Sequence, residues 1–210
     1  MAPTEKFVLR STVTSPFGRK VRMAVEVLGL QDRVTLAPAN TRDEHDTLRQ
    51  QNPLGKMPCL LPADGSPIFD SRVIIEFLQE VAGSHQLLPA SGLARYKALT
   101  AAALADGIMD AALLVVYETR FRDPGTYSER FLKLQRGKIT RGLAAFEAAL
   151  PDSNTTDIVS IGLSCALGYL DGRQQVDWRR AHGGLVSWLD AFSKREPSFD
   201  STFAEFADRP

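Results

Sequence analysis

Cysteine is scarce in this sequence, which contains only Cys59 and Cys165 among its 210 residues. The two lie far apart and neither belongs to a Cys-x-x-Cys pair. A disulfide framework is therefore not expected, and a reducing compartment is favoured. The first ten residues also lack the apolar core of a signal peptide. These observations predict a soluble, cytoplasmic protein.

An excess of charge of either sign is also missing, because Lys plus Arg and Asp plus Glu both number 25. Binding to nucleic acid or to an anionic membrane surface requires a surplus of basic groups. The most apolar stretch, residues 101–117, is interrupted by Asp106 and Asp110 and is not typical of a membrane span. We therefore expect neither nucleic acid nor a membrane as a partner.

Several catalytic motifs are absent, since the sequence has no GxSxG elbow, P-loop, GxGxxG or HExxH. The histidines His45, His85 and His182 stand in polar or turn-like surroundings without the spacing of metal ligands. We therefore expect no metal site, and any chemistry must come from other patterns.

The first part of the chain alternates between strand and helix patterns. A β-branched strand pattern, an amphipathic helix and a second strand pattern follow one another, which predicts a right-handed crossover between parallel strands. The elements expected there are a strand at 6–10, a helix from 17 to 28, a strand at 34–39, a short helix within 41–53, a hairpin around Asp64-Gly65 and a helix over 71–81. This βαβαββα order predicts an α/β domain built on a mixed sheet with helices on both faces.

The remainder of the chain has only helical patterns, which predicts an all-α second domain. Helices are expected at 92–122, 127–150, 158–170 and 178–195. The stretch 158–170 has no charged residue, so we expect a buried core helix, with Asn154 as its N-cap and Asp157 at its third position. The predicted boundaries are a first domain at 1–82, a linker at 83–91 and a helical domain at 92–210.

Two dipeptides place polar groups at the start of a predicted element. Ser15 precedes Pro16 at a helix start, where a hydroxyl caps the first turn and the helix dipole favours an anion. Met57 precedes Pro58 at a strand start, so its backbone is extended and free to pair with a bound peptide; we expect a cis bond there. Each dipeptide alone is also an ordinary structural feature.

A third dipeptide, Asp70-Ser71, caps another helix, whose N-terminus suits a carboxylate while Asp70 suits an ammonium group. In the predicted topology all three dipeptides fall at one edge of the sheet. They offer in a row a thiolate site, a peptide-backbone site and an amino-acid site. A small peptide with a thiol and a terminal α-amino acid group would satisfy all three.

Four stretches of the sequence resemble the glutathione transferase family. The resemblance is to its serine-type, bacterial cytosolic members. The similar stretches are "TSPFGRKVRMAVEVLGL", "NPLGKMPCLLPADGSPIFDSRVIIEFL", "NTTDIVSIGLSCALGYLD" and, near the end, "WLDAFSKREPSF". The resemblance covers nearly the whole chain, and its middle motif is the most specific part. It implies a thioredoxin-like first domain that binds glutathione as co-substrate, and an all-α helical bundle that completes a hydrophobic substrate pocket.

The resemblance also implies roles for individual residues. Ser15 matches the catalytic serine, and Met57, before Pro58, would pair its backbone with the cysteinyl part of glutathione. Lys56 would meet the glycyl carboxylate. The γ-glutamyl end would be held by Asp70 and Ser71.

For the second substrate, a small hydrophobic electrophile, the pocket candidates are Met109, Leu113 and Tyr117. The family resemblance implies a homodimer with a detoxification role. Ser11 and Thr12 offer other hydroxyls near Ser15, so these three remain alternatives for contact with the thiol. A glutathione-dependent isomerase or dehalogenase, or a non-catalytic glutathione-binding regulatory protein, remains an alternative function.

Overall fold

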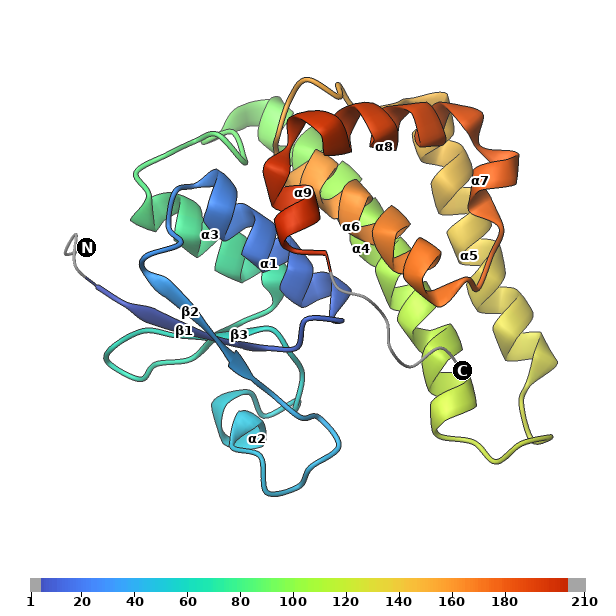
Figure 1. The fold of residues 1–210 in the computed structure, drawn as a ribbon, viewed down its shortest axis with the longest axis horizontal. Helices are drawn as coiled ribbons and strands as arrows, with labels where there is room; N and C mark the ends of the chain where they lie inside the picture. Colours follow the sequence, from blue (N-terminus) through green and yellow to red (C-terminus); the bar gives the residue numbers. More distant parts are fainter. Residues whose placement is uncertain (1–4, 204–210) are drawn as a thin grey trace. The chain divides into compact units, whose positions relative to one another are not determined.

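The structure is a computed structural model that describes residues 5–203. These residues form two compact units (Figure 1). Unit 1 contains residues 5–95 and 197–203, and unit 2 contains residues 96–196. Residues 83–91, the stretch expected as a linker, lie in unit 1 and lead into the helix that begins at Gly92.

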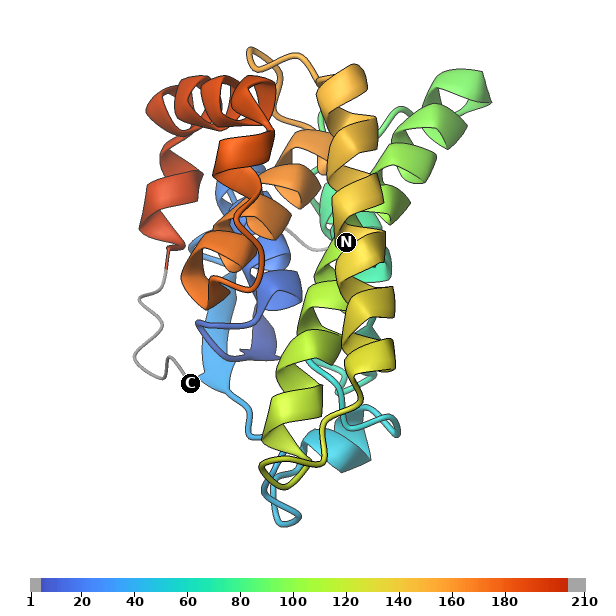
Figure 2. The same cartoon turned by 90° about the vertical axis from the view of Figure 1, so that its right-hand side faces the viewer.

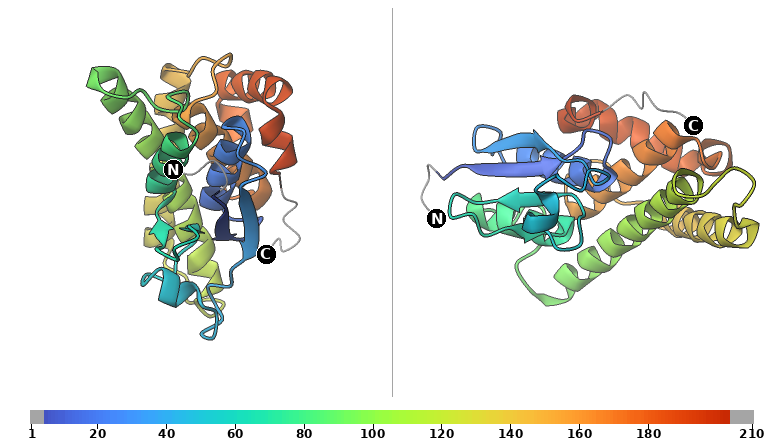
Figure 3. Two further views of the ribbon diagram at one scale, coloured as in Figure 1. Left: turned by 90° about the vertical axis from the view of Figure 1, so that its left-hand side faces the viewer. Right: turned by 90° about the horizontal axis from the view of Figure 1, so that it is seen from below.

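Unit 1 is built on a four-stranded mixed sheet, as predicted (Figures 1 and 3). Its strands are β1 (Phe7–Ser11), β2 (Val34–Pro38), β3 (Cys59–Leu61) and β4 (Ile68–Phe69), in the spatial order β2-β1-β3-β4. β1 is parallel to β2 and antiparallel to β3, and β4 is antiparallel to β3. The predicted parallel crossover and the predicted hairpin are both confirmed.

The alternation of side chains along β1 separates the two faces of the sheet. Phe7, Leu9 and Ser11 are buried on one face, where Phe7 meets Phe77 edge-on at 5.6 Å between ring centroids. The helices on this face are α1 (Pro16–Val27) and α3 (Ser71–Val81), while the short α2 (Leu48–Gln51) lies on the other side of the sheet (Figure 1). The sheet therefore has helices on both faces.

A segment from the end of the described chain completes unit 1. Helix α9 (Pro197–Ser201) packs against α1, where Arg19 donates a hydrogen bond to the carbonyl oxygen of Phe199 at 2.6 Å. The Arg19 guanidinium also lies 4.3 Å from the centroid of the Phe199 ring, a cation–π geometry. The sequence patterns did not predict this helix, because five residues are too few to show a helical period.

Unit 2 is all-helical (Figure 2). Its helices are α4 (Gly92–Arg120, whose first turn belongs to unit 1), α5 (Glu129–Ala148), α6 (Ile158–Arg173), α7 (Trp178–Ala181) and α8 (Gly183–Arg195). Every residue of α6 from Ile158 to Leu170 is buried, which confirms the predicted core helix. Gly162 lets α6 approach α4 closely, since a Cβ there would lie 3.2 Å from the Cβ of Ala105.

The N-cap of α6 differs from the prediction. The cap is Asp157, whose carboxylate accepts hydrogen bonds from the backbone amides of Val159 at 2.9 Å and Ser160 at 2.8 Å. The Ser160 hydroxyl accepts in return from the Asp157 amide, which completes a capping box. Asn154 instead lies in the preceding turn and donates its backbone amide to Asp152. The helix therefore begins three residues later than an Asn154 cap requires.

The single helix expected at 178–195 is two helices, α7 and α8, separated at His182. The carboxylate of Glu147 in α5 accepts hydrogen bonds from the backbone amides of Gly184 and Leu185, both at 2.8 Å. In a continuous helix these amides would donate to backbone carbonyl oxygens of the same helix. Because a new helix begins here, they are free to donate to Glu147. A Cβ at Gly184 would lie 2.7 Å from a Glu147 carboxylate oxygen, which explains the glycine.

Within the described residues, α4 is the one helix long and apolar enough, by length and composition, to cross a membrane. Half of its most apolar 18-residue window is buried inside the structure. The core helix of a soluble protein has the same features, so this observation is weak support for a membrane span.

Candidate functional site

Ser15 stands at the N-terminus of α1, as predicted. Its Oγ accepts a hydrogen bond from the amide of Gly18 at 3.1 Å, and Pro16 occupies the first helical position. Among residues 5–203, no acceptor takes the hydroxyl proton of Ser15. The side chain is half-buried, so it can donate this proton to a ligand at the positive end of the helix dipole.

The other two hydroxyls considered from the sequence are placed differently. Ser11 is fully buried beneath α1, where its hydroxyl donates to the carbonyl oxygen of Thr12 at 3.3 Å. A Cβ at Gly18 would lie 1.9 Å from the Ser11 Oγ, so the glycine lets the end of β1 pack against the first turn of α1. Thr12 is half-buried and directs its hydroxyl to the sulfur of Met57 at 3.4 Å.

The Met57–Pro58 peptide bond is cis, as expected from the sequence. Pro58 is buried and Met57 is half-buried. In the described part of the chain, nothing hydrogen-bonds to the backbone amide or carbonyl of Met57. These two groups are therefore available to an extended peptide that pairs alongside them.

Asn52 orders the turn that precedes Met57, and the sequence analysis did not single it out. It is 2% exposed, and its side-chain amide donates to the carbonyl oxygen of Lys56 at 2.8 Å. Its side-chain oxygen accepts from the amide of Leu54 at 3.0 Å. Lys56 is exposed at the end of this turn. The Asn52-Pro53 dipeptide, a turn-forming pair, was the signal that could have identified this residue.

Arg10 is a second residue that the sequence analysis missed. It forms an ion pair with Asp46 at 2.7 Å and donates to Thr47 at 2.8 Å and to Gln51 at 3.1 Å. Both partners of the ion pair have side chains only 12% exposed. Through these contacts Arg10 links the 46–51 segment to β1. Its signal was a charged residue within a strand, on the face opposite the apolar one.

Asp70 and Ser71 lie at the N-terminus of α3, also as predicted. Asp70 has a φ of 70°, a left-handed conformation that is uncommon for residues other than glycine and is concentrated at functional sites. Its carboxylate accepts from the Arg72 amide at 2.9 Å and forms an ion pair with the Arg72 guanidinium at 3.1 Å. Ser71 is buried and Asp70 is exposed.

Asp70 is held in its ionised form. Partial burial raises the pKa of the Asp70 carboxyl, but the hydrogen bonds and charge of Arg72, with the charge of Lys20, outweigh it, so the pKa is lowered. Lys20 is a fully buried cation in α1. The site at this helix N-terminus therefore carries a carboxylate at neutral pH.

Strand register brings the three dipeptides to one edge of the sheet. Cys59, next to Pro58, is paired with Arg10 near the end of β1 and with Phe69 at the end of β4. The starts of α1 and α3 and the start of β3 therefore lie at the same edge. The Thr12–Met57 contact joins two of these segments directly.

In unit 2, the end of α4, the two residues that follow it and the start of α5 line a groove of about 290 Å³. Its lining residues are Leu114, Tyr117, Glu118, Phe121, Arg122 and Phe131. Of the pocket candidates from the sequence, Tyr117 lines this groove. Leu113 is half-buried, Met109 is fully buried, and neither is part of the lining.

The described residues offer no other obvious reactive centre. Burial raises the pKa of the Cys59 thiol, although the charge of Arg10 acts in the opposite direction, and Cys165 is also buried. Among residues 5–203, no group of three or more His, Cys, Asp or Glu side chains could hold a metal ion.

Comparison with known proteins identifies the family. Residues 14–81 match the family described as glutathione S-transferase, N-terminal domain. The chain is 35% identical over 194 residues to the uncharacterized GST-like protein YibF of Escherichia coli K12, a match that covers 90% of this chain and 94% of YibF. The chain belongs to the glutathione S-transferase family, with the thioredoxin-like first domain and the helical region of that fold.

Two solved structures support the same conclusion. A glutathione transferase family member from Pseudomonas fluorescens Pf-5, crystallised with bound glutathione, is 40% identical with a TM-score of 0.88, covering 94% of this chain and 98% of that chain. A second structure from the same organism contains bound S-(propanoic acid)-glutathione; it is 39% identical with a TM-score of 0.84 and the same coverage.

Proposed function

We propose that this protein is a glutathione transferase that ionises the thiol of glutathione and directs it to a small hydrophobic electrophile. Unit 1 binds glutathione and unit 2 binds the electrophile. The observation that carries the proposal is the hydroxyl proton of Ser15, which has no acceptor among the described residues and stands at the N-terminus of α1. The unengaged backbone of Met57 at the same sheet edge supports it.

In this proposal each part of the tripeptide has its own partner. The backbone of Met57 pairs with the cysteinyl residue, and Lys56 binds the glycyl carboxylate. Ser71, at the amino end of α3, holds the γ-glutamyl carboxylate, while Asp70 holds the γ-glutamyl ammonium. The lowered pKa of Asp70 supports this last role, because an ionised carboxylate attracts the ammonium group at neutral pH.

The free energy that this site requires is modest. An ordinary thiol has a pKa of about 8.5, and a reduction by about two units requires ~2.7 kcal/mol of preference for the thiolate. One hydrogen bond to a charged group supplies about 1.5–3 kcal/mol. A helix N-terminus adds about 0.3–2 kcal/mol. Ser15 and the first turn of α1 are together sufficient, and Ser15 acts as a neutral donor that keeps its own proton.

The thiolate electron pair then forms a bond to an electrophilic carbon, and a leaving group departs with the electron pair of the bond that breaks. Sulfur thereby acquires a small substituent. The S-(propanoic acid)-glutathione bound to the P. fluorescens relative, a glutathione whose sulfur carries a short acid, supports this class of product. We further infer that the protein acts as a homodimer in the cytoplasm, in detoxification. Exposed apolar side chains at the start of α4, Leu93 and Tyr96, support a contact with a second copy.

Calorimetric titration with glutathione and with cysteinylglycine, which lacks the γ-glutamyl residue, tests the binding site. The wild-type protein is expected to prefer glutathione. Asp70→Asn is expected to weaken glutathione binding by about 10-fold or more, because a charge-assisted hydrogen bond contributes about 1.5–3 kcal/mol. Asp64→Asn is the matched control, since Asp64 is an exposed carboxylate in the hairpin turn.

A panel of electrophiles, assayed with and without the protein at constant glutathione, tests turnover. Acceleration above the uncatalysed rate that depends on glutathione is the expected result. Failure to bind glutathione would contradict the whole proposal. Tight binding without acceleration of any electrophile would contradict the catalytic part alone.

A further inference from the structure

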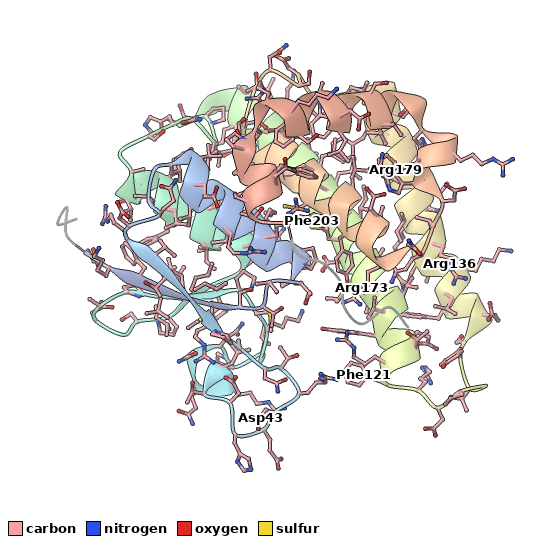
Figure 4. The ribbon with its side chains drawn as sticks, in the orientation of Figure 1. Asp43, Phe121, Arg136, Arg173, Arg179 and Phe203 are labelled. Atoms are coloured by element: carbon pink, nitrogen blue, oxygen red, sulfur yellow. The ribbon has the colours of Figure 1, made fainter. Side chains whose placement is uncertain are left out.

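Three aromatic residues line the groove in unit 2. Tyr117 belongs to the last turn of α4, Phe121 follows the last residue of that helix, and Phe131 lies in the first turn of α5. Leu114, one turn before Tyr117, adds an aliphatic side chain to the lining. Figure 4 labels Phe121, which is 65% exposed, so its side chain is accessible to a ligand from solvent.

The rings of Tyr117 and Phe121 form a corner. Their centroids lie 5.2 Å apart and their planes meet at 73°. A planar ring placed in such a corner stacks on one of the two rings and meets the other edge-on, which are the two arrangements that aromatic pairs prefer. A puckered aliphatic ring has no aromatic face or edge for either arrangement. The corner therefore favours a flat aromatic ligand.

The size of the groove limits what can occupy it. Its volume is about 290 Å³. An apolar cavity of about 150 Å³ is enough to hold benzene, so the groove has room for one substituted ring. An α-helix with its side chains is about 10 Å across, which is too wide for this space. The occupant that fits is a small molecule rather than a segment of a protein.

The polar part of the lining is an ion pair with hydrogen-bond donors to spare. Glu118, whose side chain is only 5% exposed, accepts from the backbone amide of Ser128 at 2.8 Å and from the Nε of Arg122 at 2.6 Å. The Ser128 amide, with the hydrogen bond and charge of Arg122, lowers the pKa of the Glu118 carboxyl, although burial acts in the opposite direction. The pair is therefore ionised on both sides and has no net charge.

Arg122 still offers its two terminal nitrogens. Only its Nε is engaged by Glu118, and among residues 5–203 no acceptor takes a hydrogen bond from Nη1 or Nη2. The side chain is 51% exposed and belongs to the lining of the groove. Because the positive charge is already balanced by Glu118, these donors suit an uncharged acceptor, such as a nitro or carbonyl oxygen, on a ring bound in the groove.

We propose that the electrophile bound by unit 2 is a planar aromatic molecule that carries an uncharged hydrogen-bond acceptor. The ring lies in the corner between Tyr117 and Phe121, and the acceptor binds the terminal nitrogens of Arg122. The inference rests on the proposed function, since it names the substrate class of the same enzyme.

The chemistry of such a substrate is balanced without another reactant. With a nitrobenzyl halide, the thiolate electron pair forms the new bond from sulfur to the benzylic carbon, and the halide leaves with the electron pair of the broken carbon–halogen bond. The products are an S-(nitrobenzyl)glutathione and a halide ion. Conjugates of this kind can therefore serve as stable probes of the groove.

A first pair of conjugates tests the preference for a flat ring. S-benzylglutathione and S-(cyclohexylmethyl)glutathione have the same number of carbon atoms, and the second is the more apolar. Calorimetry is expected to show about 5-fold tighter binding of the benzyl conjugate, because it alone makes aromatic contacts. Burial of apolar area would give the opposite order. Phe121→Leu keeps an apolar side chain but removes one wall of the corner, so it should abolish the preference.

A second pair of conjugates tests the acceptor. S-(4-nitrobenzyl)glutathione and S-(4-isopropylbenzyl)glutathione are similar in size, but only the nitro group accepts a hydrogen bond. The wild-type protein is expected to bind the nitro conjugate about 5-fold more tightly, and Arg122→Met should remove this difference. Arg136→Met, which removes an exposed arginine from α5, is the matched charge control and should retain it (Figure 4).

Tyr127→Leu is the matched control for the ring, since Tyr127 lies in the same connection between α4 and α5 but outside the lining. It should retain both preferences. Free glutathione is the internal control, and its affinity should stay unchanged in every variant. The two comparisons on the wild-type protein need no variant, so they remain decisive even if a substitution prevents folding.

The proposal requires both preferences. Equal or reversed affinity within either pair would overturn it, and so would a preference that survives the removal of Phe121 or Arg122. Each of these results, with normal binding of free glutathione, would leave the glutathione site intact. A protein that binds neither glutathione nor any conjugate would overturn the proposed function, and the inference with it.

Discussion

The two units of this protein use different parts of the polypeptide for their candidate sites. In unit 1 the groups are a helix N-cap at Ser15, a free backbone at Met57 and a second N-cap at Asp70, all placed by the register of the sheet. In unit 2 they are side chains that line the groove, such as Tyr117 and Phe121. The groove consists of side chains alone, whereas the unit 1 groups include the backbone of Met57 and are positioned by the sheet and by two helix starts. Under the proposed function, we therefore expect substitutions in the groove to change the specificity for the electrophile while glutathione binding stays the same.

The largest effect is expected at Ser15, whose side chain lies at a helix start in unit 1. Ser15→Ala removes one hydrogen bond to the thiolate, so kcat/KM at neutral pH is expected to fall by about 10- to 150-fold, from the ~1.5–3 kcal/mol of such a bond. Steady-state kinetics with any accepted electrophile measures this. Ser15→Gly also removes the hydroxyl but costs the helix only a few tenths of a kcal/mol, so it separates chemistry from capping.

Thr12→Val is the matched control for the hydroxyl. If activity were lost in this variant and retained in Ser15→Ala, the donor would be Thr12, and the assignment of the helix N-cap would be wrong. Equal activity of all three variants would remove the Ser15 and Thr12 hydroxyls from the mechanism.

In unit 2, we expect a single side chain to determine how α7 and α8 pack against α5. Glu147→Ala leaves the amides of Gly184 and Leu185 without their acceptor. The free energy of unfolding, measured in urea, should therefore fall by about 2 kcal/mol. Glu129→Ala, an exposed acid in the first turn of α5, is the control and should change stability by about 0.5 kcal/mol or less. A Glu147→Ala protein as stable as the wild type would show that the α7–α8 break does not depend on this contact.

A smaller effect is expected from Arg10, a side chain that supports the site in unit 1. Arg10→Met removes the ion pair with Asp46 and the hydrogen bonds to Thr47 and Gln51, so the segment that leads to Met57 should become less ordered. Calorimetry is expected to show glutathione binding weakened about 3- to 10-fold, or roughly 1 kcal/mol. Unchanged affinity for glutathione would show that Asn52 alone orders the 52–57 turn, and that the contacts of Arg10 in β1 are not required.

The smallest expected effect is a pH dependence of stability at Asp46. Backbone hydrogen bonds from Asn40 and Leu48, aided by Arg10, lower the pKa of the Asp46 carboxyl. Since the folded value lies below the unfolded value of about 3.9, the stabilisation is present above that pH and is lost as the pH falls through the folded pKa. Asp46→Asn should therefore be less stable than the wild type at pH 7, and the difference should shrink below about pH 4. A difference independent of pH would contradict the ionised role of Asp46.

Features that depend on neighbouring residues were predictable from the sequence, whereas features that depend on distant residues were not. The order of strands and helices along unit 1, the hairpin and the caps at Ser15 and Asp70 follow from local patterns, because each depends on residues a few positions apart. The cis bond before Pro58 was also anticipated. By contrast, the break between α7 and α8 depends on Glu147, which is 37 residues away from Gly184.

Two other features also differed from the expectations. Helix α9 is stabilised by Arg19, which is 180 residues from Phe199. The N-cap of α6 was assigned to Asn154 because asparagine before an acidic residue fits a capping box, but Asp157 with Ser160 fits the box equally well.

Titration of the thiol of bound glutathione, followed by the ultraviolet absorbance of the thiolate, most directly tests the claim that the N-terminus of α1 stabilises a sulfur anion. For the wild-type protein saturated with glutathione, the apparent pKa is expected about two units below the ~8.5 of an ordinary thiol, and Ser15→Ala should move it back toward that value. A bound thiol that titrates like the free one would contradict the claim.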